Sequence, residues 1–296
     1  MMSSNEPPTP GRPAESGDHV LRAITDDDNF RVITARTTDT ISGVLASQAV
    51  SPEVALPFAE LVTGTVLIRE TMSPAHRVQG LLKSPGRGSL VADAHPEGLT
   101  RGLAQLADGC EDFELRPGSI LQMMRSMANG RIHRSVVEAP SGGAVTAALM
   151  TYMQESEQIV SVIAAGARIE EGVVRSAGGY VVQLLPGASR GPLMVMTERL
   201  EAFPPFVELF EGLDSSPRRL LDELLYGMPY AQLDESPLRF GCTCSHQTVV
   251  ASLATVRRDE LAQMIEEDGV IELTCDYCRT TYRVGRTHLE GLLEPS

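Results

Sequence analysis

The chain has 296 residues, enough for about two domains, and 42% of them are hydrophobic, which excludes a globally disordered protein. The formal net charge is −14, aromatic residues make up 4% of the chain, and tryptophan is absent. An acidic surface repels nucleic acid and anionic membranes, and few aromatic side chains are available to stack on bases. We therefore expect neither nucleic acid nor a membrane as a partner.

Residues 1–18 are polar and rich in proline, without the apolar stretch of a signal peptide. We predict that this segment forms a disordered tail. No run of about 18 consecutive apolar residues occurs, so we expect no membrane-spanning helix. A soluble, cytoplasmic protein is the expectation that follows.

Residues 19–190 begin with a predicted hairpin and two helices. Two strand-like runs, Val20–Thr25 and Phe30–Arg36, flank an acidic turn. Thr38 or Asp39 can cap a helix that continues to Ala49. A second helix is predicted because apolar residues recur at helical spacing, at Ala55, Phe58, Leu61, Val62 and Val66.

The rest of this region mixes strands and helices irregularly, which predicts an α+β core domain over residues 19–190. The glycine pairs Gly142-Gly143 and Gly178-Gly179 are attributed to turns. Strands are predicted at Arg77–Leu82, Ser89–Ala94, Thr100–Ala107, Ile120–Met127 and Ile132–Glu138, then a helix from about Ala144 to Ile159, then strands at Val160–Ile169 and Val173–Leu185.

Residues 191–238 contain short amphipathic stretches separated by proline and glycine. Each stretch is shorter than the roughly 12–15 residues that an isolated helix needs, so each must pack against another surface. Nine acidic and three basic residues lie between Glu198 and Glu235, which adds repulsion. We predict a metastable helical linker, packed on the core domain through Leu193, Met196, Phe206, Leu209, Leu220 and Leu224.

Residues 239–296 contain four of the five cysteines and are predicted to form a separate small domain. We expect a helix at Asp259–Glu267 and a strand at Val270–Thr274. A domain of this size buries a small fraction of its surface and is marginally stable alone, so a bound metal would stabilise its fold.

The four cysteines occur as two close pairs, Cys242-Thr-Cys244 and Cys275-Asp-Tyr-Cys278, which a long segment separates. Two close pairs of thiolates are the tetrahedral ligand set that Zn²⁺ prefers. A CxC pair forms a small, strained ring when oxidised, and strained disulfides tend to be regulatory. Spacing alone leaves open whether the metal only stabilises the domain or also acts in a redox switch.

Other candidate groups carry weaker signals. His246 is predicted to be a surface group or to lie just outside the ligand set, because four thiolates already complete it. Cys110 is flanked by acidic residues, which disfavour a thiolate, and is interpreted as structural. The chain lacks the GxxxxGK[ST] and HExxH motifs, so no catalytic residue is assigned and we do not expect an enzyme.

Three stretches resemble the heat-shock protein 33 family of redox-regulated chaperonins. They are Ser156-Glu157-Gln158, the segment Ala177-Gly-Gly-Tyr-Val-Val-Gln-Leu-Leu-Pro-Gly187, and the cysteine domain, from Phe240-Gly-Cys-Thr-Cys-Ser245 to Tyr282. The resemblance covers nearly the whole chain from about residue 18. Gln48 stands where the family often has a histidine.

The resemblance implies a cytosolic, ATP-independent chaperone, a holdase that binds unfolding client proteins under oxidative stress. In the reduced, inactive form one Zn²⁺ per chain would be held by Cys242, Cys244, Cys275 and Cys278. Oxidation would release the zinc and form the disulfides Cys242–Cys244 and Cys275–Cys278. The terminal domain and the linker would then unfold and expose apolar surface, and the active form would be a homodimer.

Two other functions use the same cysteines. A zinc-ribbon protein would bind nucleic acid. However, the segment from Phe240 to Ser296 contains nine acidic residues and five arginines, and its negative charge would repel nucleic acid. A thiol–disulfide oxidoreductase would use Cys275 and Cys278. In such enzymes the CxxC pair opens a helix, whereas here it follows a predicted strand.

Overall fold

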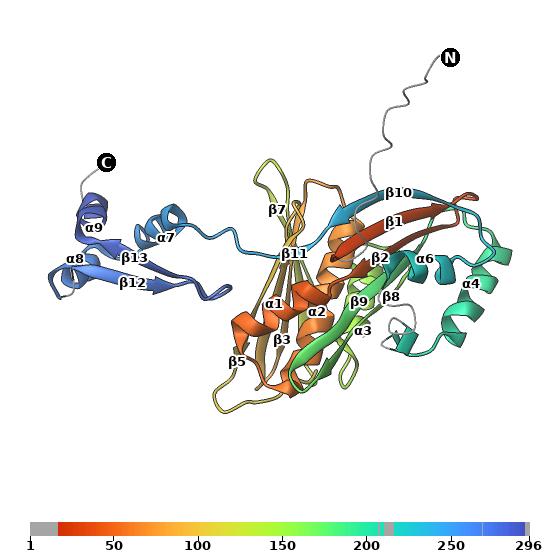
Figure 1. The fold of residues 1–296 in the computed structure, drawn as a ribbon, viewed down its shortest axis with the longest axis horizontal. Coiled ribbons are helices and arrows are strands. Elements are labelled where there is room, and N and C mark those ends of the chain that lie inside the picture. The colour runs from red at the N-terminus through yellow and green to blue at the C-terminus, as the bar shows by residue number, and fades with distance from the viewer. Residues whose placement is uncertain (1–16, 207, 210–215, 268, 294–296) are drawn as a thin grey trace, which may run out of the picture.

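A computed structural model describes residues 17–206, 208–209, 216–267 and 269–293 of the chain. The predicted α+β class is confirmed: two sheets enclose helices, and a small third sheet lies in the C-terminal domain (Figure 1). Residues 1–16 of the predicted tail lie outside the described residues. Asp18 belongs to the fold, because it is buried and its Oδ2 accepts a hydrogen bond from the backbone amide of Thr40 (2.6 Å).

The first sheet has five strands in the order β10-β1-β2-β9-β8. Neighbouring strands pair antiparallel throughout, and β1 and β2 form the predicted hairpin. Its strands are β1 (His19–Thr25), β2 (Phe30–Arg36), β8 (Ser161–Glu170), β9 (Val173–Leu184) and β10 (Tyr230–Pro237).

The second sheet has six strands in the order β11-β5-β4-β3-β6-β7. The central hairpins are antiparallel, and the two-residue strand β11 pairs in parallel with β5 at the edge. Its strands are β3 (Arg77–Ser84), β4 (Gly88–Ala94), β5 (Leu99–Leu106), β6 (Ile120–Ser126), β7 (Ile132–Glu138) and β11 (Arg239–Phe240).

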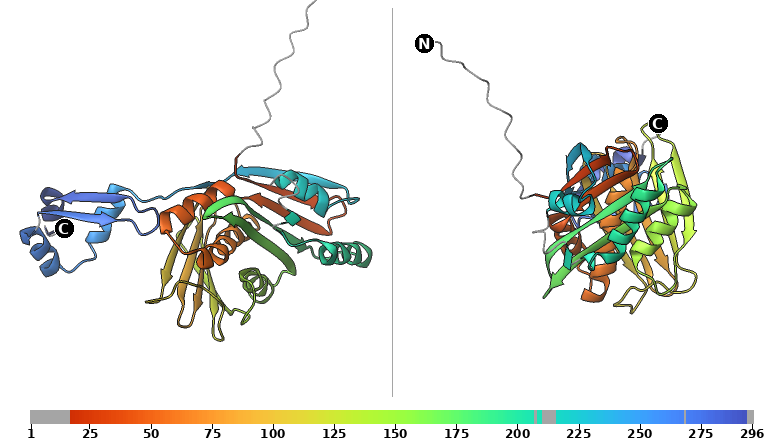
Figure 2. Two further views of the ribbon diagram at one scale, coloured as in Figure 1. Left: turned by 60° about the horizontal axis from the view of Figure 1, so that its bottom comes forward. Right: turned by 90° about the vertical axis from the view of Figure 1, so that its right-hand side faces the viewer.

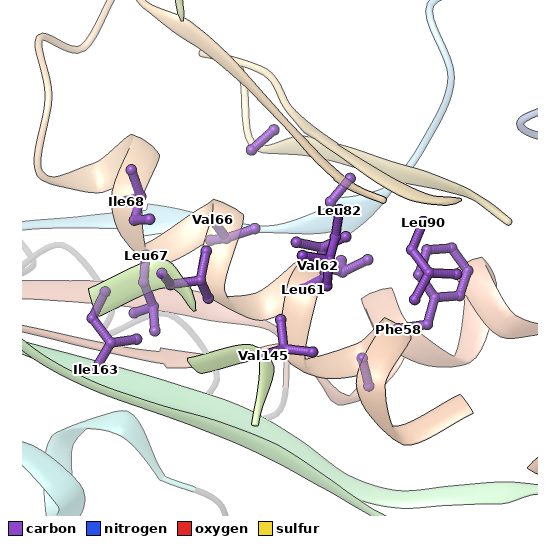
Figure 3. Packing of buried hydrophobic residues seen from close by; sticks show 14 of the residues in the cluster. Phe58, Leu61, Val62, Val66, Leu67, Ile68, Leu82, Leu90, Val145 and Ile163 are labelled. Carbon is purple, nitrogen blue, oxygen red and sulfur yellow. The ribbon is translucent and has the colours of Figure 1, made fainter. Parts of the chain in front are cut away.

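Helix α2 (Pro52–Glu70) lies between the two sheets and forms the centre of the core. Its apolar residues point to both sides. Phe58 and Leu61 lie toward Leu82 and Leu90 of the six-stranded sheet, and Leu67 lies toward Ile163 of β8 (Figure 3). Helices α1 (Thr38–Gln48) and α3 (Val145–Glu155) complete this layer.

The glycine pair Gly178-Gly179 is not in a turn, as the sequence had suggested, but in the middle of β9. A Cβ atom added at Gly179 would lie 2.8 Å from Leu67 Cδ1 and 2.6 Å from the carbonyl oxygen of Ala164. Glycine is needed here because α2 packs directly on the strand backbone. Gly142 does occupy a turn, with φ of +68°.

Residues 191–238 are only partly helical. Helices α4 (Arg190–Ala202) and α6 (Pro217–Leu224) are present, but residues 230–237 form β10, so the helical prediction is wrong there. The strand forms because it pairs with the otherwise free edge of β1, from His19↔Pro237 to Thr25↔Tyr230. Most of its side chains are exposed, so it lacks the alternation that identifies a strand in a sequence.

The C-terminal domain has its own small core, separate from those of the two sheets. It extends from one end of the molecule, opposite α4 and α6 (Figures 1 and 2). The predicted strand is confirmed as β12 (Val270–Thr274), and the predicted helix corresponds to α8 (Arg258–Glu267). The other elements are α7 (His246–Leu253), β13 (Thr281–Gly285) and α9 (Arg286–Leu293). In the described part of the chain, no helix is both long and apolar enough to cross a membrane.

Glu60 of α2 has a largely buried carboxyl group, whose ionisation links the stability of the core to pH. Burial raises the pKa of its carboxyl to about 7, although the backbone amide of Val145 donates a hydrogen bond that acts in the opposite direction. Because the folded-state pKa is raised, stability is lost as the pH increases from about 4.5 to about 7.

We therefore expect Glu60→Gln to raise the free energy of unfolding at pH 8 by on the order of 1–2 kcal/mol. Urea denaturation at pH 8 and at pH 4.5 would measure this difference. At pH 4.5 the gain should largely disappear, because the native carboxyl is then protonated. An equal effect at both pH values would contradict the assignment.

Candidate metal centre

The four cysteines lie on two loops that meet. Cys242 and Cys244 follow β11, and Cys275 and Cys278 lie in the turn between β12 and β13. The turn is closed by hydrogen bonds from the amide of Cys275 to the carbonyl of Thr280 (2.9 Å) and from the amide of Arg279 to the carbonyl of Cys275 (2.8 Å). The fold thus brings together two pairs that lie far apart in the sequence.

The four Sγ atoms all lie within 4.8 Å of one another. The Cys242–Cys275 pair is separated by 3.8 Å and the Cys244–Cys278 pair by 3.4 Å. A tetrahedral ion with metal–sulfur bonds of about 2.3 Å places its ligands about 3.8 Å apart. The cluster therefore fits a metal ion held by four thiolates.

Hydroxyl groups and the backbone surround three of the four sulfurs. The Tyr282 hydroxyl is 3.1 Å from Cys244 Sγ, and the Thr280 hydroxyl is 3.3 Å from Cys278 Sγ. The backbone amides of Tyr277 and Cys278 face Cys275. These donors stabilise negative charge on the sulfurs, as the outer partners of metal ligands usually do.

The thiols differ in acidity. Burial raises the pKa of Cys244 to about 12, and it also raises the pKa of Cys275. Burial acts in the same direction on Cys278, but hydrogen bonds from the hydroxyl and amide of Thr280, among others, outweigh it and lower the pKa to about 7. A bound cation favours the thiolate form of all its ligands, so metal binding would release protons here.

A family model described as Hsp33 protein matches residues 18–285. The chain belongs to the Hsp33 family. The 33 kDa chaperonin of Syntrophotalea carbinolica is 28% identical, and the alignment covers 93% of this chain and 99% of that protein. The 33 kDa chaperonin of Thermus thermophilus is also 28% identical, with 93% and 86% covered.

The fold is shared with a solved structure. The crystal structure of the 33 kDa chaperonin (heat shock protein 33 homolog) of Thermotoga maritima matches with a TM-score of 0.80 at 21% identity, covering 93% of this chain and 97% of the other. The resemblance found in the sequence is thus confirmed as membership of the Hsp33 family.

The two other candidate groups of this Hsp33 chain lie outside the cluster. His246 Nε2 is 3.2 Å from the carbonyl oxygen of Arg283, and its ring packs edge-on against His288. Cys110 belongs to the core domain, where its Sγ lies 3.2 Å from the carbonyl oxygen of Gly86 and 4.0 Å from the guanidinium of Arg87. Its acidic sequence neighbours gave no indication of this contact with Arg87.

Sequence reasoning missed the core-domain residues that contact the cluster. Arg101 Nη1 donates to Cys242 Sγ at 2.9 Å, although the two residues are 141 positions apart. Gln48 Nε2 donates to the carbonyl oxygens of Asp276 (2.8 Å) and Tyr277 (3.0 Å). The departure of Gln48 from the family pattern was the one available signal, and it did not indicate a contact.

The linker helices bury fewer of their apolar side chains than the sequence predicted. Met196, Leu220 and Leu224 are buried as predicted, and Phe206 and Leu209 are partly buried against the same cluster. Leu193 is 36% exposed, so the prediction for it is wrong. Its neighbours Met194 (54%) and Val195 (47%) are also exposed, and Met196 is the only fully buried residue described in α4. Helix α4 is thus weakly packed and presents apolar side chains to solvent.

Proposed function

We propose that this chain is a redox-regulated, ATP-independent holdase, kept inactive by one Zn²⁺ per chain and activated when oxidation releases the metal. Its partners would be unfolding client proteins in the cytoplasm, and the oxidised form would be a homodimer. The observation that carries the proposal is the cluster of four cysteine thiols, gathered within 4.8 Å in a domain with little core of its own.

The small core makes the terminal domain dependent on its metal. Among the described residues, its fully buried apolar side chains are only Leu253, Leu261, Ile265, Ile271, Val284 and Leu289. Zinc bound by thiolates contributes on the order of 10–16 kcal/mol of apparent free energy in small zinc domains. Loss of the ion would therefore unfold this domain.

The route from the terminal domain to the linker helices is indirect. Helices α4 and α6 lie at the other end of the molecule from α7, α8 and α9 (Figure 1). The connection runs through β11, paired with β5 at only two positions, and β10, paired with β1. Helix α6 packs on β1 and β2. Release of β11 and then of β10 would loosen the surface on which α6 rests.

The two alternative functions receive less support. The CxxC pair lies in a turn between two strands, so no helix N-terminus lowers a thiol pKa as an oxidoreductase requires. The acidic sequence of the terminal domain disfavours nucleic acid.

The first prediction concerns the ligands. Zinc analysis of the reduced protein should find one ion per chain. Replacing Cys242, Cys244, Cys275 or Cys278 by Ser should lower zinc affinity by at least about tenfold, since it removes a direct ligand. Cys110→Ser and His246→Ala are the controls and should retain one ion per chain. Full zinc retention in Cys275→Ser would refute the ligand assignment.

The second prediction concerns the disulfides formed by peroxide. Peptide mapping should find Cys242–Cys244 and Cys275–Cys278, because the shortest loops are favoured once zinc leaves and the domain unfolds. In the folded domain, Cys242 approaches Cys275 and Cys244 approaches Cys278. Dominant cross-links between the pairs would therefore mean that oxidation occurs before unfolding, against this proposal.

The third prediction concerns the linker. After peroxide treatment, amides of α4 and α6 should exchange faster with solvent, while those of β2, β9 and α2 stay protected. A chain ending after Ser236 keeps most of β10 but lacks β11 and the zinc domain. It should suppress aggregation of an unfolding client without any oxidant. Unchanged linker protection in an oxidised, active protein would place the client site elsewhere.

A further inference from the structure

Within the described part of the chain, the metal cluster also receives a hydrogen bond from outside its own domain. The groups that face Cys244, Cys275 and Cys278 belong to the C-terminal domain. Cys242 is contacted instead by Arg101 of β5, in the six-stranded sheet. The core domain thus supplies an outer partner to one ligand of the proposed zinc ion.

Arg101 is held in place by its own sheet. Its Nε donates to Asp93 Oδ2 (2.8 Å), and Asp93 also accepts two hydrogen bonds from Arg77 (2.7 and 2.6 Å). The Asp93 side chain is 4% exposed. A guanidinium fixed by a buried carboxylate loses little additional freedom when it binds a second acceptor. Arg101 is therefore pre-oriented toward Cys242.

The same surface holds the CxxC turn through Tyr277. The guanidinium carbon of Arg101 lies 4.2 Å from the centroid of the Tyr277 ring, within the range of a cation–π contact. Gln79 Nε2 lies 3.3 Å from the Tyr277 hydroxyl. We call Gln48, Arg77, Gln79, Asp93 and Arg101 the docking corner.

Gln48 also binds the CxxC turn. The side chain is buried, and its Oε1 accepts a hydrogen bond from the backbone amide of Ala104 (3.2 Å). That contact aims its Nε2 at the carbonyl oxygens of Asp276 and Tyr277. Gln48 thus fixes the backbone between the last two cysteines to both α1 and β5.

The charges of the two surfaces are complementary. A divalent ion with four thiolates carries a net charge of about −2. Arg77, Asp93 and Arg101 together carry one net positive charge, and Arg101 directs it at Cys242. Formation of disulfides would remove the thiolate that Arg101 contacts, so the docked arrangement favours the metal-bound form.

We propose that Arg101 is a positioning residue for the metal centre, and that the docking corner couples zinc retention to attachment of the terminal domain. This inference rests on the proposed zinc-dependent function. Coupling between two equilibria is reciprocal: if zinc strengthens docking, docking strengthens zinc binding by the same factor. Substitutions in the core domain must then alter metal affinity without touching a ligand.

The test is zinc transfer from the reduced, full-length protein to a chromophoric chelator. Arg101→Gln should lower zinc affinity by about 10–100-fold, as loss of a metal ligand's outer partner typically does. Arg77 still pairs with Asp93 in this variant, so no buried carboxylate is left alone. Arg87→Gln is the matched control. Arg87 is also ion-paired, and its side chain has a similar exposed fraction (19% against 15%). It lies in the turn between β3 and β4, away from Asp93, and its replacement should leave affinity unchanged.

A second variant and a spectrum separate docking from direct contact with sulfur. Gln48→Ala should weaken zinc binding by about 3–10-fold, since it removes two neutral hydrogen bonds. In the cobalt-substituted protein, Arg101→Gln should shift the thiolate-to-cobalt charge-transfer bands, Gln48→Ala should not, and Arg101→Lys should restore part of the affinity.

Each outcome decides a different point. If the unmodified protein binds no zinc, the proposed function itself fails. If it binds zinc and Arg101→Gln matches Arg87→Gln in affinity and spectrum, only the role of Arg101 is refuted. Weaker binding in Gln48→Ala alone would also refute the role of Arg101.

Discussion

Four sulfur atoms within 4.8 Å of one another can all be thiolates only if a cation lies among them, because like charges at that distance repel strongly. The rest of the proposed switch depends on this constraint. The surrounding core is small, so in the proposed switch a bound metal would supply most of the free energy that holds the terminal domain together. Oxidation of the thiolates would then also remove the domain's main source of stability.

The arrangement of the strands determines which other parts of the molecule would be destabilised when the terminal domain unfolds. The terminal domain is attached through the docking corner and through β11, which pairs with β5 beside Arg101. The next segment toward the N-terminus is β10, which closes the edge of the five-stranded sheet below α6. In the proposed switch, loss of the metal would therefore reach the linker helices through a strand edge. A strand edge is easier to release than a central strand, since only one neighbour holds it.

Much of the fold could be predicted because its pattern is local. The alternation in Val270–Thr274 and the acidic turn between Val20–Thr25 and Phe30–Arg36 identify strands without knowledge of their partners. Strand β10 was missed because its side chains are mostly exposed and its conformation depends on the edge of β1. Gly178-Gly179 was mistaken for a turn because close approach of α2 leaves no trace in the neighbouring residues.

The candidate site likewise has a part that the sequence predicts and a part that it does not. The spacing of the cysteine pairs alone predicts that the four sulfurs gather into one cluster, because the chemistry of four thiolates depends on few other groups. The contacts of Arg101 and Gln48 depend on how two domains meet, and residues so distant along the chain carry no common sequence pattern.

The docking corner and the surface beneath the linker helices differ in polarity, and this difference gives them different parts in the proposed function. The docking corner consists of amide, guanidinium and carboxylate side chains, in which Arg77 and Arg101 pair with Asp93, so its exposure uncovers little apolar area. Beneath α4 and α6, by contrast, lie Phe30, Val32, Tyr180 and Val182, which pack in one apolar cluster with residues of the linker helices. Exposed apolar patches bind unfolded chains, whereas paired charges do not. Capture of clients would thus belong to the linker end, and sensing of oxidants to the metal end.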